Sequence, residues 1–350
     1  MIGSALLRRT ASTAAAKAQK TAFHTIMALP EPAMRAFAGD PIVVDGQELA
    51  TDTQAMLKMM KISRQPDLGE IPVPAARRVM RHAAQLAGGD QTVGRIQDFW
   101  VHGHKARLYV PSGAAATPGP LMVFLHGGGF IFGDIESHDA PCRFLAENAG
   151  VRILSVNYRL GPEAPFPAAW TDAVGIFTSV LERAEEFGAD PGRIGVGGDS
   201  AGGNLAGGIA LEFKDKCAFQ FLIYPTTTAD HATRSYELFR EGFFLTTAFM
   251  DAAARGYMLD VDLREDPRVV LMGAQIPENV APAYIATAGF DPLRDEGEDY
   301  ARKLMDAGVQ VEVERFPDQI HGFLNCVGAG PTHKAAAAHL AEKFKELAGS

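Results

Sequence analysis

A serine in a glycine-rich turn is the residue of this sequence best suited to act as a nucleophile. Ser200 is the centre of Gly198-Asp199-Ser200-Ala201-Gly202, which follows the apolar run 193–197 and precedes the helical stretch 203–211. Strand, tight turn and helix in this order form a nucleophile elbow, in which glycines on both sides of the serine let strand and helix pass closely. The same pattern also occurs in ordinary glycine-rich turns, so the surrounding sequence must decide between the two interpretations.

A serine hydroxyl needs a general base and an orienting carboxylate before it can attack a carbonyl carbon. His321 follows the last predicted strand, and Asp291 follows the strand before it. The carboxyl ends of the strands carry the site in open α/β sheets, and the chain order Ser, Asp, His is the one found in α/β-hydrolases. Four other acids are rivals of Asp291 and are expected to decorate the following helix or the histidine loop: Asp295, Glu296, Asp299 and Asp318.

Successive glycines in His126-Gly127-Gly128-Gly129 supply the third requirement, a site for the developing oxyanion. Glycines let backbone N–H groups point at a negative charge, and the loss of one such donor typically costs about 10²- to 10³-fold in rate. A phosphate-binding loop is the alternative interpretation. The glycine spacing matches neither the P-loop nor the dinucleotide-binding pattern, so we favour an oxyanion site.

Apolar runs suited to buried strands alternate with helical stretches from about residue 95 onward. Continuous apolar runs of this kind are typical of strands covered on both faces, and their alternation with helices predicts a mostly parallel, doubly wound α/β sheet. The predicted strands of the sheet span residues 95–111, a hairpin, and then 121–125, 151–156, 193–199, 219–224, 283–288 and 310–316.

Two helical segments interrupt or precede this alternation and are expected to form a two-part cap over the site. The spacing of apolar residues before residue 95 is helical, and the stretch after Thr226 is too long for a plain connection. We therefore divide the chain into a flexible, basic N-terminal extension (1–30), a first cap part (31–94), the α/β core (95–225), a second cap part (226–281) and the rest of the core (282–350).

Composition excludes several classes of protein. The 350 residues carry a net charge of -9, which argues against a nucleic-acid partner. No apolar run approaches the roughly 18 residues that span a bilayer, so we expect no stable membrane insertion. The three cysteines do not form a disulfide framework and favour a reducing compartment, the cytoplasm. The sequence implies neither a metal nor an organic cofactor.

Five motifs in order resemble the hormone-sensitive-lipase-like esterases, the bacterial family IV branch of the α/β-hydrolases. They are His126-Gly127-Gly128-Gly129-Phe130, residues 158–163, residues 198–202, Asp291-Pro292-Leu293 and His321-Gly322-Phe323. The resemblance implies that Ser200 is the nucleophile, His321 the general acid and base, Asp291 the orienting acid, and the N–H groups of Gly128, Gly129 and Ala201 the oxyanion donors. Gly161 and the residues 318–320 depart from the family pattern without touching an expected catalytic atom.

The resemblance implies a serine carboxylesterase for small-molecule esters with short to medium acyl chains. An amidase or another acyl hydrolase in the same site is the nearest alternative. A non-catalytic receptor is a more remote one, because the plant gibberellin receptors resemble this family but lack the histidine that His321 supplies here. Six apolar residues are candidates for the acyl pocket: Phe130, Phe132, Phe243, Phe244, Leu245 and Met250. The predicted edge strand 311–316 could pair with its own copy in a homodimer.

Overall fold

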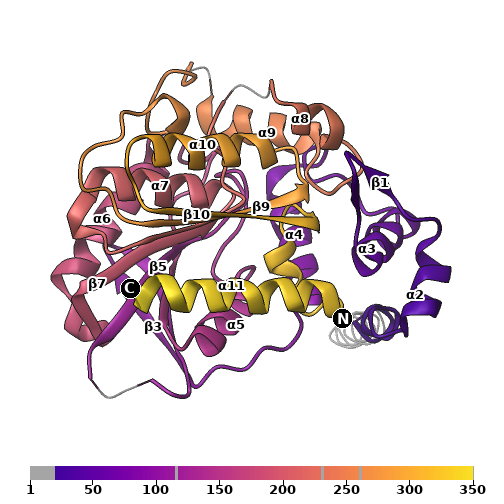
Figure 1. The fold of residues 1–350 in the computed structure, drawn as a ribbon, viewed down its shortest axis with the longest axis horizontal. Coiled ribbons are helices and arrows are strands. Elements are labelled where there is room, and N and C mark those ends of the chain that lie inside the picture. Colours follow the sequence, from indigo (N-terminus) through magenta and orange to yellow (C-terminus); the bar gives the residue numbers. More distant parts are fainter. Residues whose placement is uncertain (1–19, 115–116, 230–231, 260–261, 350) are drawn as a thin grey trace, which may run out of the picture.

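The computed structural model describes residues 20–114, 117–229, 232–259 and 262–349. Within these residues the core is an eight-stranded sheet in the order β10-β9-β8-β7-β5-β6-β4-β3 (Figure 1). The strands are β3 (Arg95–Val101), β4 (His104–Val110), β5 (Gly119–Leu125), β6 (Arg152–Val156), β7 (Ala189–Asp199), β8 (Gln220–Ile223), β9 (Ala283–Phe290) and β10 (Val311–Ile320). β4 pairs antiparallel with both β3 and β6, and the other neighbours pair parallel. The predicted α/β fold is confirmed.

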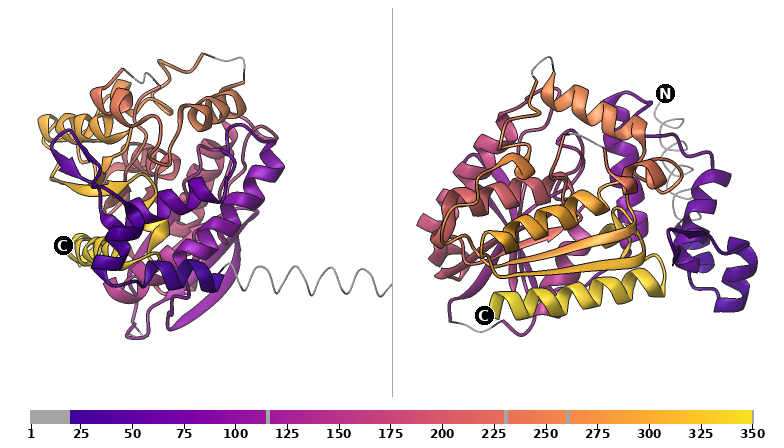
Figure 2. Two further views of the ribbon diagram at one scale, coloured as in Figure 1. Left: turned by 90° about the vertical axis from the view of Figure 1, so that its right-hand side faces the viewer. Right: turned by 45° about the horizontal axis from the view of Figure 1, so that its top comes forward.

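Helices cover both faces of the sheet (Figures 1 and 2). α6, α7 and α10 lie on one face, and α5 and α11 lie on the other. The helices are α2 (Glu31–Ala38), α3 (Thr51–Ile62), α4 (Val73–Gly88), α5 (Asp139–Ala149), α6 (Ala168–Glu182), α7 (Ala201–Phe213), α8 (Arg234–Phe239), α9 (Thr247–Met258), α10 (Arg294–Asp306) and α11 (Pro331–Gly349), with short 3-10 helices at Ala184–Phe187, Lys214–Lys216, Leu271–Gly273 and Phe323–Cys326.

Strand β5 shows how one apolar run supplies both layers of the core. Leu121, Val123 and Leu125 pack in the cluster that includes α6 and α7. Met122 and Phe124 pack in the opposite cluster with α5 and α11. Successive side chains of a strand point to opposite faces of a sheet, so a strand between two helix layers must be apolar throughout. This requirement explains the continuous apolar run from Leu121 to Leu125, from which the strand was predicted.

The two segments expected to form a cap lie at the end of the sheet toward which β9 and β10 point (Figure 1). They contact each other, because the hydroxyl of Thr246 donates a hydrogen bond to Asp67 at 2.6 Å. The first segment also contains a small hairpin that the helical pattern did not predict. Its strands, β1 (Val43–Val44) and β2 (Gln47–Glu48), are too short to show an alternating pattern in the sequence.

The described chain includes a helical stretch before the expected boundary at residue 30. Residues 20–27 are helical, and Met27 is buried against Leu49 and Met56. Residues 1–19 lie outside the described residues, and a flexible extension over 1–30 stays a prediction. In the described part of the chain, no helix combines the length and apolar character needed to cross a bilayer.

Candidate active site

Ser200 stands on a sharp turn between β7 and α7. Its backbone has φ 55° and ψ -120°, a combination that non-glycine residues rarely adopt. The turn is held from both sides, since the Ser200 N–H donates to the carbonyl oxygen of Ile223 at 2.9 Å and the Ser200 carbonyl accepts from Asn204 N–H at 3.0 Å. The predicted nucleophile elbow is therefore present.

The glycines that flank the serine are required by close approach to β5. A Cβ atom on Gly202 would lie 1.9 Å from the carbonyl oxygen of Leu125, and one on Gly198 would lie 2.4 Å from the same atom. Real Cβ atoms do not come so close to a carbonyl oxygen. The two glycines therefore allow the elbow to sit directly against the end of β5.

Three side chains from three strand ends form a hydrogen-bonded chain. His321, directly after β10, has its Nδ1 2.7 Å from Oδ2 of Asp291 and its Nε2 3.0 Å from Oγ of Ser200. Asp291, directly after β9, is fully buried, and its Oδ1 accepts the N–H of Leu293 at 2.8 Å. Because a carboxylate only accepts, Nδ1 carries the proton and Nε2 is left free to take the proton of the serine hydroxyl.

The four rival acids lie elsewhere and bond other groups. Glu296 accepts the N–H of Thr227 at 2.6 Å, Asp299 pairs with Arg302, Asp295 pairs with Arg294 at 2.7 Å, and Asp318 accepts from the side chain of Gln319 at 3.2 Å. Among the described carboxylates, Asp291 is the one that bonds His321.

The glycine loop after β5 lies against the elbow through its first glycine. The N–H of Gly127 donates to Asp199 Oδ1 at 2.7 Å and is therefore not available to a substrate. Gly128 and Gly129 follow with φ of 119° and 59°. No acceptor in the described part of the chain bonds their N–H groups or that of Ala201, the first residue of α7. Three N–H groups are thus free to bind an anion.

A buried ion pair supports the elbow and the glycine loop from behind. His138 Nε2 lies 3.2 Å from Asp199 Oδ1, and both side chains are almost completely buried. Burial opposes ionisation of Asp199, but His138, the Gly127 N–H and His126 together hold the pKa of the carboxyl below its usual value. Burial also opposes protonation of His138, but Asp199 and Asp134 together raise the pKa of this imidazole. The two groups therefore favour each other's charged form.

His126 is a structural part of the loop. Its ring stacks on Tyr158 with centroids 4.4 Å apart, its Nδ1 donates to the Gly127 carbonyl at 3.0 Å, and the hydroxyl of Tyr158 donates to its carbonyl at 2.6 Å. Burial, together with the neighbouring His138, lowers the pKa of His126 to about 4. The imidazole is therefore neutral at physiological pH.

Three of the six pocket candidates pack against neighbouring aromatic rings. Phe132 is completely buried and packs against Phe249, and Phe130 stacks on Tyr257 with centroids 4.0 Å apart. Neighbouring rings therefore cover both side chains in this structure. Phe243 likewise packs against Phe239 and Phe290.

The remaining candidates lie beside residues that follow His321 and Asp291. Phe244 is 41% exposed and lies beside Gly322, the neighbour of His321. Leu245 and Met250 are buried in a small cluster with Leu293, two residues after Asp291.

Sequence reasoning missed the residues that act through others, above all Asp199 and His138. Asp199 was noticed only as part of the serine motif. His138 stands 61 residues before Asp199, and its place next to a buried carboxylate has no signal in the local sequence. In the described residues, no group of three or more His, Cys, Asp or Glu side chains is arranged to hold a metal ion.

Comparison with known proteins identifies the family of the chain. A family model described as alpha/beta hydrolase fold matches residues 122–325. The chain is 41% identical to the carboxylic ester hydrolase LipN of Mycobacterium tuberculosis, over 86% of this chain and 84% of that protein. It is 34% identical to an ethyl acetate hydrolase of Pseudomonas putida, over 71% and 82% of the two chains.

A solved structure extends the likeness to three dimensions. The ester hydrolase EH1AB1 from the metagenome of Lake Arreo, in complex with a bipyridine phosphonate derivative, matches with a TM-score of 0.82. The two chains are 34% identical, and the match covers 86% of this chain and 100% of the other. By fold, family model and relatives, the chain belongs to the hormone-sensitive-lipase-like carboxylic ester hydrolases of the α/β-hydrolase fold.

Proposed function

We propose that the chain hydrolyses esters through an acyl-enzyme intermediate on Ser200. The observation that carries the proposal is the buried hydrogen-bonded chain from Ser200 through His321 to Asp291, with distances of 3.0 and 2.7 Å. A serine hydroxyl attacks an ester only when a base removes its proton. His321 Nε2 lies within hydrogen-bonding distance of Ser200 Oγ, which supports its role as this base.

The first half of the reaction forms the acyl-enzyme. Ser200 Oγ attacks the ester carbonyl carbon while His321 Nε2 takes the hydroxyl proton. The carbonyl oxygen becomes an oxyanion, which the N–H groups of Gly128, Gly129 and Ala201 bind. The intermediate then collapses, the bond to the alcohol oxygen breaks, and His321 gives its proton to the leaving alcohol. Asp291 stays ionised and holds the imidazolium in place.

The second half uses water in place of Ser200. His321 takes a proton from a water molecule as its oxygen attacks the acyl carbon, and the same three N–H groups bind the new oxyanion. Collapse returns the proton to Ser200 Oγ and releases the carboxylic acid. The enzyme is regenerated without a metal or organic cofactor.

We propose short to medium acyl chains, from acetyl to about octanoyl, as substrates. The name of the Pseudomonas putida relative, an ethyl acetate hydrolase, supports the short end of this range. The two helical segments at the end of the sheet support an upper limit, because we propose that they form a cap over the site. Leu245, Met250 and Phe244 are the residues that we propose to line the acyl pocket.

The test is a panel of p-nitrophenyl esters of graded acyl length with the wild type and Ser200→Ala. We expect the highest kcat/KM between acetate and octanoate, and a loss of at least about 10⁴-fold in Ser200→Ala. Unchanged activity in the variant would show that another group does the chemistry. An optimum on long chains would contradict the proposed acyl range, and preferential cleavage of matched anilides would favour the amidase alternative.

We also propose a homodimer through the outer edge of β10. The charged side chains of this strand bond partners within the chain, as in Glu312 with Lys343 and Glu314 with Tyr284. Val313, 37% exposed, is left as an apolar contact on the edge. Light scattering should give twice the chain mass at micromolar concentration, and a monomer would contradict this arrangement.

A cytoplasmic location is the remaining proposal. Cys142, Cys217 and Cys326 are all unpaired in the structure, which suits a reducing compartment. Fractionation of the source cells would test it, since activity in the secreted fraction would contradict it.

A further inference from the structure

The loop that carries Asp291 is fastened to a helix of the second cap part. Ser235, at the start of α8, donates its N–H to Asp295 Oδ2 at 2.8 Å and its hydroxyl to the carbonyl of Pro292 at 2.9 Å. In return, the N–H of Asp295 donates to the Ser235 hydroxyl at 3.2 Å. One side of the acid loop is thus fixed by hydrogen bonds with Ser235.

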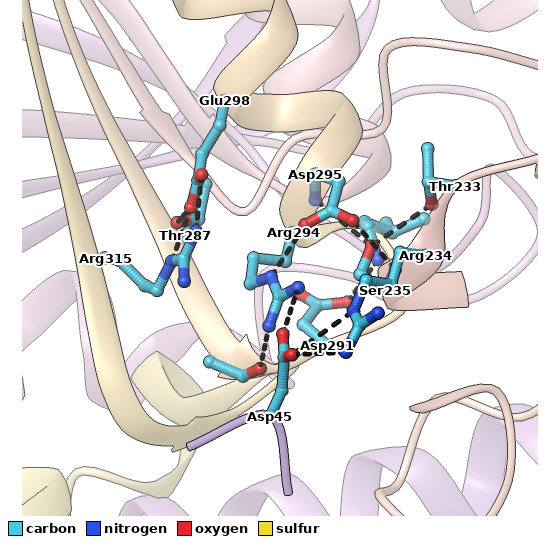
Figure 3. A network of polar contacts seen from close by, with 12 residues as sticks. Asp45, Thr233, Arg234, Ser235, Thr287, Asp291, Arg294, Asp295, Glu298 and Arg315 are labelled. Atoms are coloured by element: carbon cyan, nitrogen blue, oxygen red, sulfur yellow. Dashed lines mark hydrogen bonds and ion pairs between the residues drawn. The ribbon is translucent and has the colours of Figure 1, made fainter. Parts of the chain in front are cut away.

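A buried arginine occupies the other side of the loop (Figure 3). Arg294 is 3% exposed and donates to Asp295 Oδ1 at 2.7 Å, to the Gly289 carbonyl at 3.2 Å and to Asp45 Oδ2 at 3.0 Å. Its guanidinium carbon also lies 5.3 Å from the ring centre of Phe239. A guanidinium is always charged in a protein, and a buried charge needs paired partners. Asp45 and Asp295 are its ion-pair partners among the described residues.

Asp45 reaches this arginine from far away in the sequence. It stands in the turn of the β1–β2 hairpin with φ 56°, and its other oxygen, Oδ1, accepts from Arg234 at 2.8 Å. The hydrogen bond from Arg234, and after it the one from Arg294, hold the pKa of Asp45 below its usual value. Gln47 adds a further contact, from its side-chain amide to the Gly289 carbonyl at 3.3 Å. The hairpin is therefore fixed against the end of β9.

The same segment contacts the end of β10, just before His321. The N–H of Ala50 donates to the carbonyl of Asp318 at 3.0 Å. The hydroxyl of Thr53 lies 3.4 Å from His333 Nε2, and His333 Nδ1 lies 2.8 Å from Gln319 Oε1. Residues 45–53 thus contact the start of α10, after Asp291, and the end of β10, before His321.

Arg294 is also placed to compete with His321 for the carboxylate of Asp291. It follows Asp291 by three residues, and its N–H donates to the Asp291 carbonyl at 3.1 Å. If the guanidinium lost Asp45, it would keep Asp295. The Asp291 carboxylate, in the same loop, would then be its next partner. An ion pair between Arg294 and Asp291 would draw Asp291 Oδ2 away from His321 Nδ1.

We propose that Asp45 is a positioning residue for ester hydrolysis: by binding Arg294 it keeps this guanidinium away from Asp291, so that Asp291 stays bonded to His321. The inference rests on the proposed catalytic role of Asp291 and His321. It assigns the N-terminal hairpin a part in holding the acid and base, beyond covering the site.

Asp45→Asn is the test variant, because Asn keeps the size of the side chain and tolerates the left-handed turn. We expect kcat per active site to fall about 10- to 100-fold, as for other small misplacements of catalytic groups, with little change in KM. We also expect the acid limb of the kcat/KM profile to move to lower pH. A cation beside Asp291 weakens the attraction that this carboxylate exerts on a protonated imidazole.

Asp45 itself forms ion pairs with Arg234 and Arg294 and does not bond His321. The described side chains that contact His321 are Asp291, Ser200 and the ring of Tyr224, 4.7 Å away. On the far side of the network, Arg315 is bonded to Glu298 at 2.7 Å. A shift of the acid limb to lower pH would therefore indicate that Arg294 has moved toward Asp291. A purely structural role of Asp45 would lower the melting temperature without moving the limb.

Arg234→Ala is the matched control. It removes the other guanidinium from the same carboxylate, its side chain is 70% exposed, and the bond from Asp45 to Arg294 stays in place. We expect wild-type kcat and an unmoved acid limb. Active sites are counted by burst titration with diethyl p-nitrophenyl phosphate.

Two results separate the inference from the function on which it rests. A wild type that the phosphate ester does not label at Ser200 would overturn the proposed function and the inference with it. A labelled wild type, together with an Asp45→Asn variant that has unchanged kcat and pH profile, would overturn the role of Asp45 alone.

Discussion

The Asp199 carboxylate accepts a hydrogen bond from the backbone N–H of Gly127, with 2.7 Å between nitrogen and oxygen. Asp199 directly precedes Ser200, and Gly127 directly precedes the two glycines that we propose as oxyanion donors. One bond therefore sets the position of the glycine loop relative to the serine. His138 Nε2 lies 3.2 Å from the same carboxylate oxygen and compensates the negative charge of the buried Asp199.

His138→Ala should destabilise the protein strongly, because it leaves the buried Asp199 charge without its partner. We expect a loss of about 3 kcal/mol or more in the free energy of unfolding, measured with urea at pH 6. His138→Gln keeps a donor near the position of Nε2 and should recover part of this loss.

His104→Ala is the control for this experiment. His104 lies 3.4 Å from Asp172, but Asp172 keeps Arg159 as a partner, so the expected loss is below about 1 kcal/mol. Equal losses in the two alanine variants would mean that the ion pair between His138 and Asp199 does not contribute more to stability than the contact between His104 and Asp172.

Stability should fall as the pH drops from 6.5 toward 4 because His126 is buried in its neutral form. Its pKa is about 4 in the folded protein, against 6.5 for a free imidazole. In this interval the unfolded chain binds a proton that the folded chain does not, so unfolding becomes easier at lower pH. At pH 4.5 the effect of this one group should be about 2 to 3 kcal/mol.

Urea titrations of the wild type and of His126→Asn at pH 6.5 and 4.5 isolate this contribution. The stability advantage of the wild type over the variant should shrink by that amount at the lower pH. An advantage that is the same at both values would show that His126 does not stay neutral in the fold.

Gly202→Ala should damage the elbow, since its Cβ would lie 1.9 Å from the Leu125 carbonyl oxygen. Relief of this overlap must shift α7 or β5, at a typical cost of about 1 to 3 kcal/mol. Ester hydrolysis should fall as well, because Ser200 would move with α7. The control is Gly113→Ala, where nothing lies within 4 Å of the new atom. The explanation fails if calorimetry and activity do not distinguish the two variants.

Thr246→Ala should loosen helix α9. The Thr246 hydroxyl accepts the N–H of Phe249 at 3.1 Å as the N-cap and donates to Asp67 at 2.6 Å. Loss of an N-cap typically costs about 1 kcal/mol. Phe249 and Ala253 of this helix lie against Gly129, so we expect lower activity together with a lower melting temperature.

The neighbouring Thr247→Ala serves as the comparison, because its hydroxyl makes only a 3.5 Å contact with the Arg240 carbonyl. It should behave like the wild type in both measurements. If both threonine variants lose the same stability, the N-cap is not the cause.

The sequence was sufficient for those parts of the fold that depend on short stretches. The run from Leu121 to Leu125 is apolar because helices cover both faces of its strand, so periodicity alone predicted it. The loops that carry Ser200, Asp291 and His321 follow from where such strands end. This reasoning needs no knowledge of how distant segments pack.

The features that could not be predicted from the sequence are contacts between residues far apart in the chain. Asp45 binds Arg294 across 249 positions, from a hairpin whose strands have two residues each. His138 meets Asp199 only because α5 packs behind the elbow. The covered positions of Phe130 and Phe132 likewise depend on rings of the second cap part, Tyr257 and Phe249. Tertiary packing, which no local pattern encodes, decided each of these cases.

The mass of the protein after reaction with diethyl p-nitrophenyl phosphate tests the central claim most directly. This reagent transfers its phosphoryl group to a serine that a base has activated, with release of p-nitrophenolate. We predict that the wild type gains one diethyl phosphoryl group on the peptide that contains Ser200, that His321→Ala reacts far more slowly, and that Ser200→Ala gains none. A label on another residue, or equal labelling of Ser200→Ala, would contradict the account.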